Sequence, residues 1–151
     1  MLGDPIPTLA LPLKEREVGC NDFNKLKAHF QMKHRIDGAE FGSITVDGFD
    51  IGYDFLIRLS GEIKKRKKKL SKAVFGTSHT ISLEEAKYIF EKGTERLIIG
   101  SGHNSMVELS KEASEYFKKK KVRVDLLPTP EAIQQWNKAK GSIIGLFHVT
   151  C

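Results

Sequence analysis

The chain has 151 residues, 40% of them hydrophobic, which is enough for one globular domain with a single core. The formal net charge is +6, but residues 64–72 alone carry seven positive and no negative side chains, so the remainder is close to neutral. This distribution excludes a uniformly basic protein, and no apolar run approaches the ~18 residues that a membrane span needs. The two cysteines suggest no disulfide framework, so we expect a reducing, cytoplasmic location.

Residues 1–35 show no sustained hydrophobic period, and three prolines in the first twelve residues make a secretory signal a poor interpretation. Two interpretations stay open. This stretch is either a poorly ordered extension or sequence that is not normally translated, because Met32 stands just before the expected regular structure. We predict a single globular domain over residues 36–151.

Residues 41–59 alternate apolar and polar side chains on both sides of Asp47-Gly48, which predicts a β-hairpin. The basic run that follows has only Ile63 and Leu70 as apolar ends. It therefore predicts a water-exposed strand or an extended connection.

The second half of the chain alternates helix and strand signals. A helix is predicted to start at Ser82, whose capping box includes Glu85, and to end at Gly93. Residues 96–149 then predict strand, helix, strand, helix, strand, with Thr129 as the N-cap of the last helix. This order predicts an α/β (α+β) fold with a mixed sheet, in which the hairpin precedes a β-α-β-α-β parallel half. The hairpin either extends that sheet or packs as a second layer.

Ligands of open parallel sheets bind beyond the carboxyl ends of the strands, and polar or flexible residues gather at those positions here. The glycine-rich turn at 100–102 presents amides to an anion or, alternatively, is a tight turn that needs a positive φ. The predicted ligand pocket consists of Gly100, Ser101, Gly102, Thr129, His148, Cys151 and His79.

His148 and Cys151 have the spacing H-x-x-C, and His79 and His103 are two further histidines that could approach them. The tighter pairs typical of zinc sites do not occur, and a cysteine at position 151 is a weak candidate nucleophile. We therefore predict no metal, no cofactor and no catalytic residue, with an enzyme that uses His148 and Cys151 as an alternative.

The basic run has three open interpretations: a solvated edge that lysines protect from pairing, a sequence-independent nucleic-acid surface, or a contact for an acidic protein. The predicted basic surface consists of Lys64, Lys65, Arg66, Lys67, Lys68 and Lys69.

The motifs FGSITVDG, GTSH, LIIGSG, VRVDLLPTPEAI and GLFHVTC, in this order, resemble the adipogenesis-associated domain family over about residues 36–151. This domain-of-unknown-function family includes mitochondrial respiratory complex I assembly factor 3, and the lysine-rich run resembles its prokaryotic branch. The resemblance implies a three-layer fold on a mixed sheet and action through protein partners, but no activity. It also implies that signature positions fall at Gly76, Thr77, His79, Gly100, Gly102, Thr129, Ala132 and residues 147–151.

Together these features predict a small binding or assembly-type protein. Its ligand is a protein partner or a small anion held at the carboxyl ends of the parallel strands. The alternatives are non-specific nucleic-acid binding through the basic run and an enzyme.

Overall fold

A five-stranded mixed sheet forms the centre of the structure, a computed structural model that describes residues 33–151. Its strand order is β5-β4-β10-β7-β9; β7 is parallel to β9 and β10, and β4 is antiparallel to β5 and β10. The strands are β4 (Phe55–Ile57), β5 (Ile63–Lys65), β7 (Arg96–Gly100), β9 (Arg123–Leu127) and β10 (Ile143–Phe147). The predicted parallel half is confirmed.

Two smaller sheets and four helices complete the part of the chain from residue 33 onward. One sheet consists of β1 (Ile36–Glu40), β2 (Ser43–Val46) and β3 (Phe49–Ile51), and the other of β6 (Thr80–Ile81) and β8 (Glu108–Leu109). The helices are α2 (Lys69–Phe75), α3 (Leu83–Ile89), α4 (Lys111–Lys119) and α5 (Thr129–Lys138).

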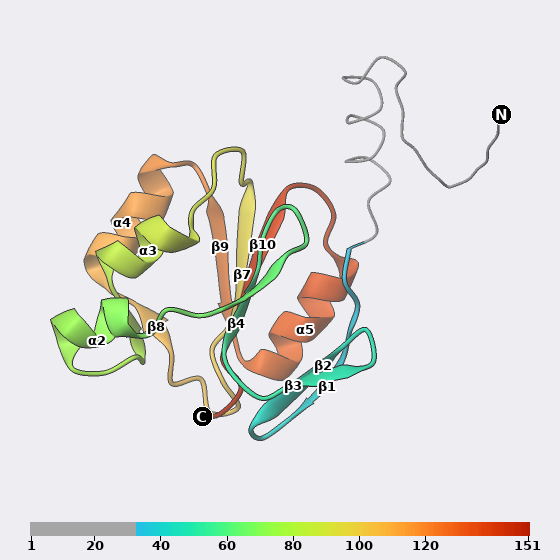
Figure 1. Cartoon of the computed structure of the whole chain (residues 1–151). Helices are drawn as coiled ribbons and strands as arrows, with labels where there is room; N and C mark the ends of the chain where they lie inside the picture. Colours follow the sequence, from blue (N-terminus) through green and yellow to red (C-terminus); the bar gives the residue numbers. More distant parts are fainter. Residues whose placement is uncertain (1–32) are drawn as a thin grey trace, which may run out of the picture. The chain divides into compact units, whose positions relative to one another are not determined.

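These elements form three layers, as expected. Helices α3 and α4 cover one face of the central sheet, and α5 with the β1–β3 sheet covers the other (Figure 1). The strands supply both cores by alternation. In β7, Ile98 packs in the cluster that contains Trp136 of α5, whereas Leu97 and Ile99 pack in the cluster that contains Phe117 of α4.

The predicted hairpin is present but shorter than expected. Strands β2 and β3 pair around Asp47-Gly48, both of which have positive φ, as a tight hairpin turn requires. The second strand ends at Ile51, and β4 joins the central sheet instead. The hairpin β2–β3, together with β1, therefore forms part of a second layer. The segment that follows it extends the central sheet, through the antiparallel strands β4 and β5.

The three predicted helices are present, and the predicted cap at Ser82 is confirmed. Ser82 caps α3 and accepts the amide of Glu85, and Ser110 caps α4 and accepts the amide of Ala113. Helix α3 ends at Ile89, before Gly93, and α2 is a helix where we expected a strand or connection. Within residues 33–151, no helix combines the length and the apolar character needed to cross a bilayer.

The predicted N-terminal extension, as far as residue 32, lies outside the described residues. The unit that contains the three layers begins at His34, whose carbonyl accepts the indole N–H of Trp136 at 2.8 Å.

His34 makes a pH-dependent contact at the edge of this unit. Its Nδ1 lies 2.5 Å from Asp47 Oδ2 and its Nε2 lies 2.6 Å from Gly61 O. Both partners are acceptors, so both contacts are complete only when the ring is protonated. The hydrogen bond with Asp47 raises the pKa of His34 above 6.5, although partial burial opposes this effect.

A histidine whose pKa is raised by folding stabilises the folded state at a pH below its pKa in the unfolded chain. This stabilisation is lost as the pH rises through its pKa in the folded state. We therefore expect the urea midpoint of the native protein to fall between pH 6 and pH 9 by more than that of the His34→Gln variant. Equal pH slopes for the two proteins would contradict this prediction. The His103→Gln variant, which changes a half-buried histidine that contacts neither Asp47 nor Gly61, serves as the control.

Candidate functional site

The predicted site residues at the strand ends do lie together. Gly100 at the end of β7 is paired with Phe147 of β10 and with Leu127 of β9, so the three parallel strands end at one level. The segments that follow these strands therefore start side by side, as the topology rule for parallel sheets requires.

Thr129 holds two of these segments together. Its hydroxyl accepts the amide of Gly102 at 2.9 Å and donates to the carbonyl of His148 at 3.1 Å. The prediction that Thr129 is an N-cap is wrong, because the N-cap is Pro128 and Thr129 is the first residue of α5. Its side chain is fully buried and binds across the sheet end instead of capping its own helix.

The glycine-rich turn packs closely against the segments that follow β9 and β10. A Cβ at Gly100 would lie 2.9 Å from Phe147 Cδ1 and 3.1 Å from Thr129 Oγ1, and the first distance is shorter than a van der Waals contact. The four amides from residue 101 to residue 104 donate to Leu127 O, Thr129 Oγ1, Thr150 O and Cys151 O. An anion at this turn would have to displace one of these hydrogen bonds.

His148 is buried, and the carboxylate of Asp54, the residue just before β4, holds its ring in place. Its Nδ1 lies 2.6 Å from Asp54 Oδ2, and the other oxygen of Asp54 accepts the amide of Val149 at 3.0 Å. Because a carboxylate only accepts, Nδ1 donates, and in a neutral ring Nε2 then carries the lone pair. Nε2 lies 3.2 Å from the hydroxyl of Thr150.

Asp54 remains ionised although it is buried. Burial alone would raise its pKa, but hydrogen bonds from His148 and from the amide of Val149, with the nearby charge of Lys68, lower the pKa to about 2. The site therefore contains a permanent negative charge directly behind the imidazole of His148.

A buried ion network extends from Asp54 to helix α3. The Arg66 guanidinium donates to Asp54 at 3.1 Å, to Glu85 at 2.6 and 3.1 Å, and to the carbonyl of Ser78 at 2.6 Å. Glu85 also accepts the hydroxyl of Ser71. Burial alone would lower the pKa of Arg66, but the hydrogen bonds and charges of Glu85 and Asp54 raise it.

This network corrects one predicted site residue. We predicted Arg66 as part of a basic surface, but it is only 4% exposed. Two carboxylates in the interior need a cation, and arginine meets both with its fixed fork of donors. One weak signal was present in the sequence, since Arg66 is the single arginine in a run of lysines.

The rest of the basic run faces several environments. Lys64 and Lys65 lie in β5, which is an edge strand of the central sheet, where lysines discourage pairing with another chain. The amino group of Lys67 lies 4.6 Å from the ring of Tyr88, and that of Lys68 lies 3.5 Å from Asp54. Lys69 begins α2 and is exposed.

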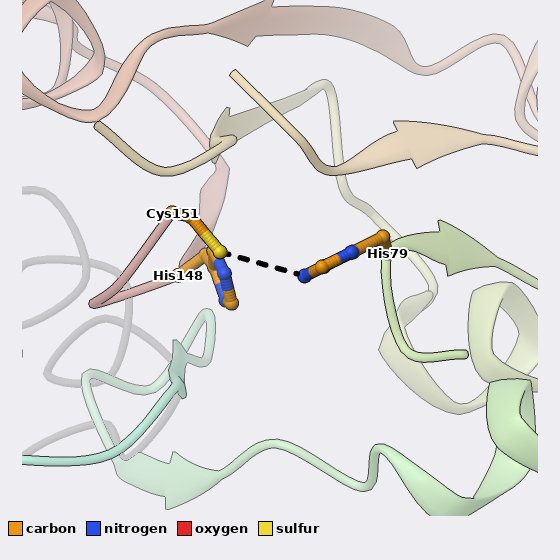
Figure 2. Close-up of side chains that lie close together, drawn as sticks. All are labelled: His79, His148 and Cys151. Carbon is orange, nitrogen blue, oxygen red and sulfur yellow. Dashed lines mark hydrogen bonds between the residues drawn. The ribbon is translucent and has the colours of Figure 1, made fainter. Parts of the chain in front are cut away.

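His79, His148 and Cys151 form a close cluster, which we call the His-His-Cys cluster (Figure 2). One donor atom from each side chain lies within 4.8 Å of the other two, and Cys151 Sγ lies 3.8 Å from His79 Nε2. His79 and Cys151 are half-buried, while His148 is buried. His103, the other candidate histidine, instead bonds Thr150 O and lies against the ring of Phe41.

Sequence reasoning missed Asp54 and Glu85. Asp54 lies in an alternating stretch that indicated only a strand, and Glu85 matched a capping box. Both carboxylates bond Arg66, and Asp54 also bonds His148; these partners lie on separate elements, so no local pattern could reveal the role of either carboxylate.

Comparisons with known proteins give a family and a fold. A family model described as a protein of unknown function (DUF498/DUF598) matches residues 36–142, which include Asp54, Arg66 and Glu85 but end before His148. A conserved hypothetical protein from Pyrococcus horikoshii is 32% identical, with a TM-score of 0.70, over 78% of this chain and 99% of that one.

Two further solved structures are similar. The protein named MT938 is 31% identical, with a TM-score of 0.66, over 79% of this chain and 100% of that one. A domain from Bordetella pertussis, described as Mth938-like, is 12% identical with a TM-score of 0.53, over 77% of this chain and 85% of that one. At that identity the likeness concerns the fold alone, and none of these descriptions names an activity.

Proposed function

Since the chain belongs to the DUF498/DUF598 family of proteins of unknown function, we propose a function from its own surface: it binds a protein partner beside residues 149–151. The observation that carries this proposal is an exposed apolar surface next to those residues. Phe41 is 69% exposed and Met106 is 48% exposed. Large exposed apolar side chains that gather at one place are typical of protein interaction sites.

Backbone hydrogen bonds bring the chain at Phe41 and at Met106 to the same segment, residues 149–151. The amide of Gly42, next to Phe41, donates to Val149 O at 2.7 Å, and the amide of Met106 donates to Cys151 O at 3.2 Å. The Phe41 ring also lies 6.0 Å from the ring of His103, measured between centroids. We call Phe41, His103, Met106 and residues 149–151 the tail surface.

The other predicted ligand classes receive less support. The amides of the glycine-rich turn already have partners within the chain, which disfavours a small anion. An enzyme that pairs His148 with Cys151 would need these two side chains bonded, but the sulfur bonds His79 and His148 Nε2 bonds Thr150. The resemblance to a family with a respiratory assembly factor supports an assembly-type role. Nucleic-acid binding through the lysines stays an alternative prediction.

The test is affinity purification from the native cells with a matched pair of variants. The variant with Phe41→Asp and Met106→Asp should lose a stoichiometric protein partner that the native protein retains at high salt. The Phe49→Asp variant should keep it. Phe49 is 76% exposed but pairs with Val46 at the opposite end of the β1–β3 sheet from Phe41.

Mass spectrometry of the retained proteins gives the result. The same partner in all three samples, or no stoichiometric protein in any, would overturn the proposal. Nucleic acid that leaves when the salt is raised would instead assign the function to the lysines. An unchanged urea midpoint in each variant shows that the loss of a partner comes from the changed surface and not from unfolding.

A further inference from the structure

The His-His-Cys cluster has the composition of a soft metal site. Imidazole nitrogen and thiolate sulfur are the ligands that Zn²⁺ takes in proteins. The three side chains come from two segments, because His79 precedes β6 whereas His148 and Cys151 follow β10. The fold therefore brings His79, and not His103, to the H-x-x-C pair, which the spacing of the sequence could not decide.

The distances within the cluster suit a tetrahedral ion. With Zn–S at about 2.3 Å and Zn–N at about 2.0–2.1 Å, tetrahedral geometry separates the sulfur and a nitrogen by about 3.6 Å. Cys151 Sγ and His79 Nε2 are 3.8 Å apart, and the third donor lies within 4.8 Å of both. A bound ion would draw the three donors closer together and would take the place of the Thr150 hydroxyl at His148 Nε2.

Asp54 prepares His148 for this role. Metal-binding histidines usually donate their second N–H to a carboxylate, which fixes the ring and directs the lone pair of the other nitrogen. Asp54 accepts from His148 Nδ1 at 2.6 Å, and it is in turn held by Arg66. The buried ion network thus makes Asp54 a positioning residue behind the ligand nitrogen.

A nucleophilic cysteine explains the same cluster less well. In such a site the carboxylate orients the histidine that activates the sulfur. Here Asp54 orients His148, whereas His79 is the histidine bonded to the sulfur. Two histidines and one sulfur around a common centre are more than a nucleophile needs and match a set of three ligands.

We propose that His79, His148 and Cys151 bind one Zn²⁺ ion and leave its fourth position open to solvent or to a ligand. His79 and Cys151 are only half-buried, so the ion is reached from the surface. Three protein ligands with one open position are the pattern of exchangeable and catalytic zinc sites rather than of closed structural ones. This inference goes beyond partner binding and does not depend on it.

The test uses the untagged full chain, reduced, with Cys20→Ser in every sample so that Cys151 is its one thiol. Titration with Co²⁺ alone should saturate at one equivalent and give a thiolate-to-cobalt charge-transfer band. Zn²⁺ alone should then bleach the band by displacement. Cys151→Ser should abolish the band, and His79→Ala should weaken Zn²⁺ binding by about 10-fold or more.

His103→Ala is the matched control, because His103 is another half-buried histidine that bonds Thr150 O but lies outside the cluster. It should keep the native affinity. The proposal is overturned if no thiolate band appears, if the band survives Cys151→Ser, or if His103→Ala weakens binding as much as His79→Ala. Both informative variants change half-buried side chains, so they report on binding even where a buried His148 variant does not fold.

The Asp54→Asn variant tests whether Asp54 positions His148 for the ion or only stabilises the fold. It should weaken Zn²⁺ affinity of the folded protein by about 10–100-fold while the thiolate band of the cobalt form remains. An unchanged affinity, with only a lower unfolding midpoint, would remove Asp54 from the metal site.

Discussion

Replacing Arg66 with methionine is expected to lower the free energy of unfolding by about 3–5 kcal/mol, because it leaves the buried Glu85 without its cation and Asp54 with only the partly exposed Lys68. The side chains of Arg66, Asp54 and Glu85 are at most 1% exposed. Arg66 also donates to the carbonyl of Ser78, which would lose a partner in the interior.

Lys64→Met is the matched control, since Lys64 lies in the same basic run but on the exposed edge strand β5. Its effect should stay within about 0.5 kcal/mol, as for most surface changes. Urea unfolding followed by the fluorescence of Trp136, the one tryptophan of the chain and fully buried, measures both. Equal midpoints for the two variants would show that the buried network contributes no more than a surface lysine.

Gly102→Ala is expected to have the second large effect. Gly102 has a φ of +102°, and a Cβ there would overlap the backbone of Cys151 and lie 2.8 Å from His148 Cδ2. The backbone conformation alone costs about 1–2 kcal/mol for a residue with a side chain. Overlap with backbone adds about 1–3 kcal/mol, because the neighbour cannot rotate away.

Gly93→Ala isolates the steric part of this effect. Gly93 has a φ of +95°, but nothing lies within 4 Å of a Cβ placed there. The difference between the two variants in urea unfolding therefore measures the close approach of residues 148–151. The same Gly102 variant should raise the reaction rate of the Cys151 thiol with a disulfide reagent, measured with Cys20→Ser present, because the tail is displaced. Equal stability of the two variants would contradict the close contact.

Local signals in the sequence determined most of the framework. Asp47-Gly48 defined the hairpin, Ser82 marked the start of a helix, and the alternation of helix and strand after residue 96 gave the parallel half. These features depend on neighbouring residues, through turn conformation, capping and hydrophobic period. The topology rule then placed the candidate site at the carboxyl ends of the strands, and Gly100, Thr129 and His148 do lie together there.

Only the tertiary structure decided what those residues do. The sequence marks Arg66 only as the one arginine among lysines, and its role appears when Asp54 and Glu85 are brought to it from separate elements. In the same way, His79 and Cys151 are 72 positions apart and meet only because β6 and the end of β10 converge. Pairing between buried charges and between ligand atoms depends on distance in space, whereas hydrophobic period and capping depend on distance along the chain.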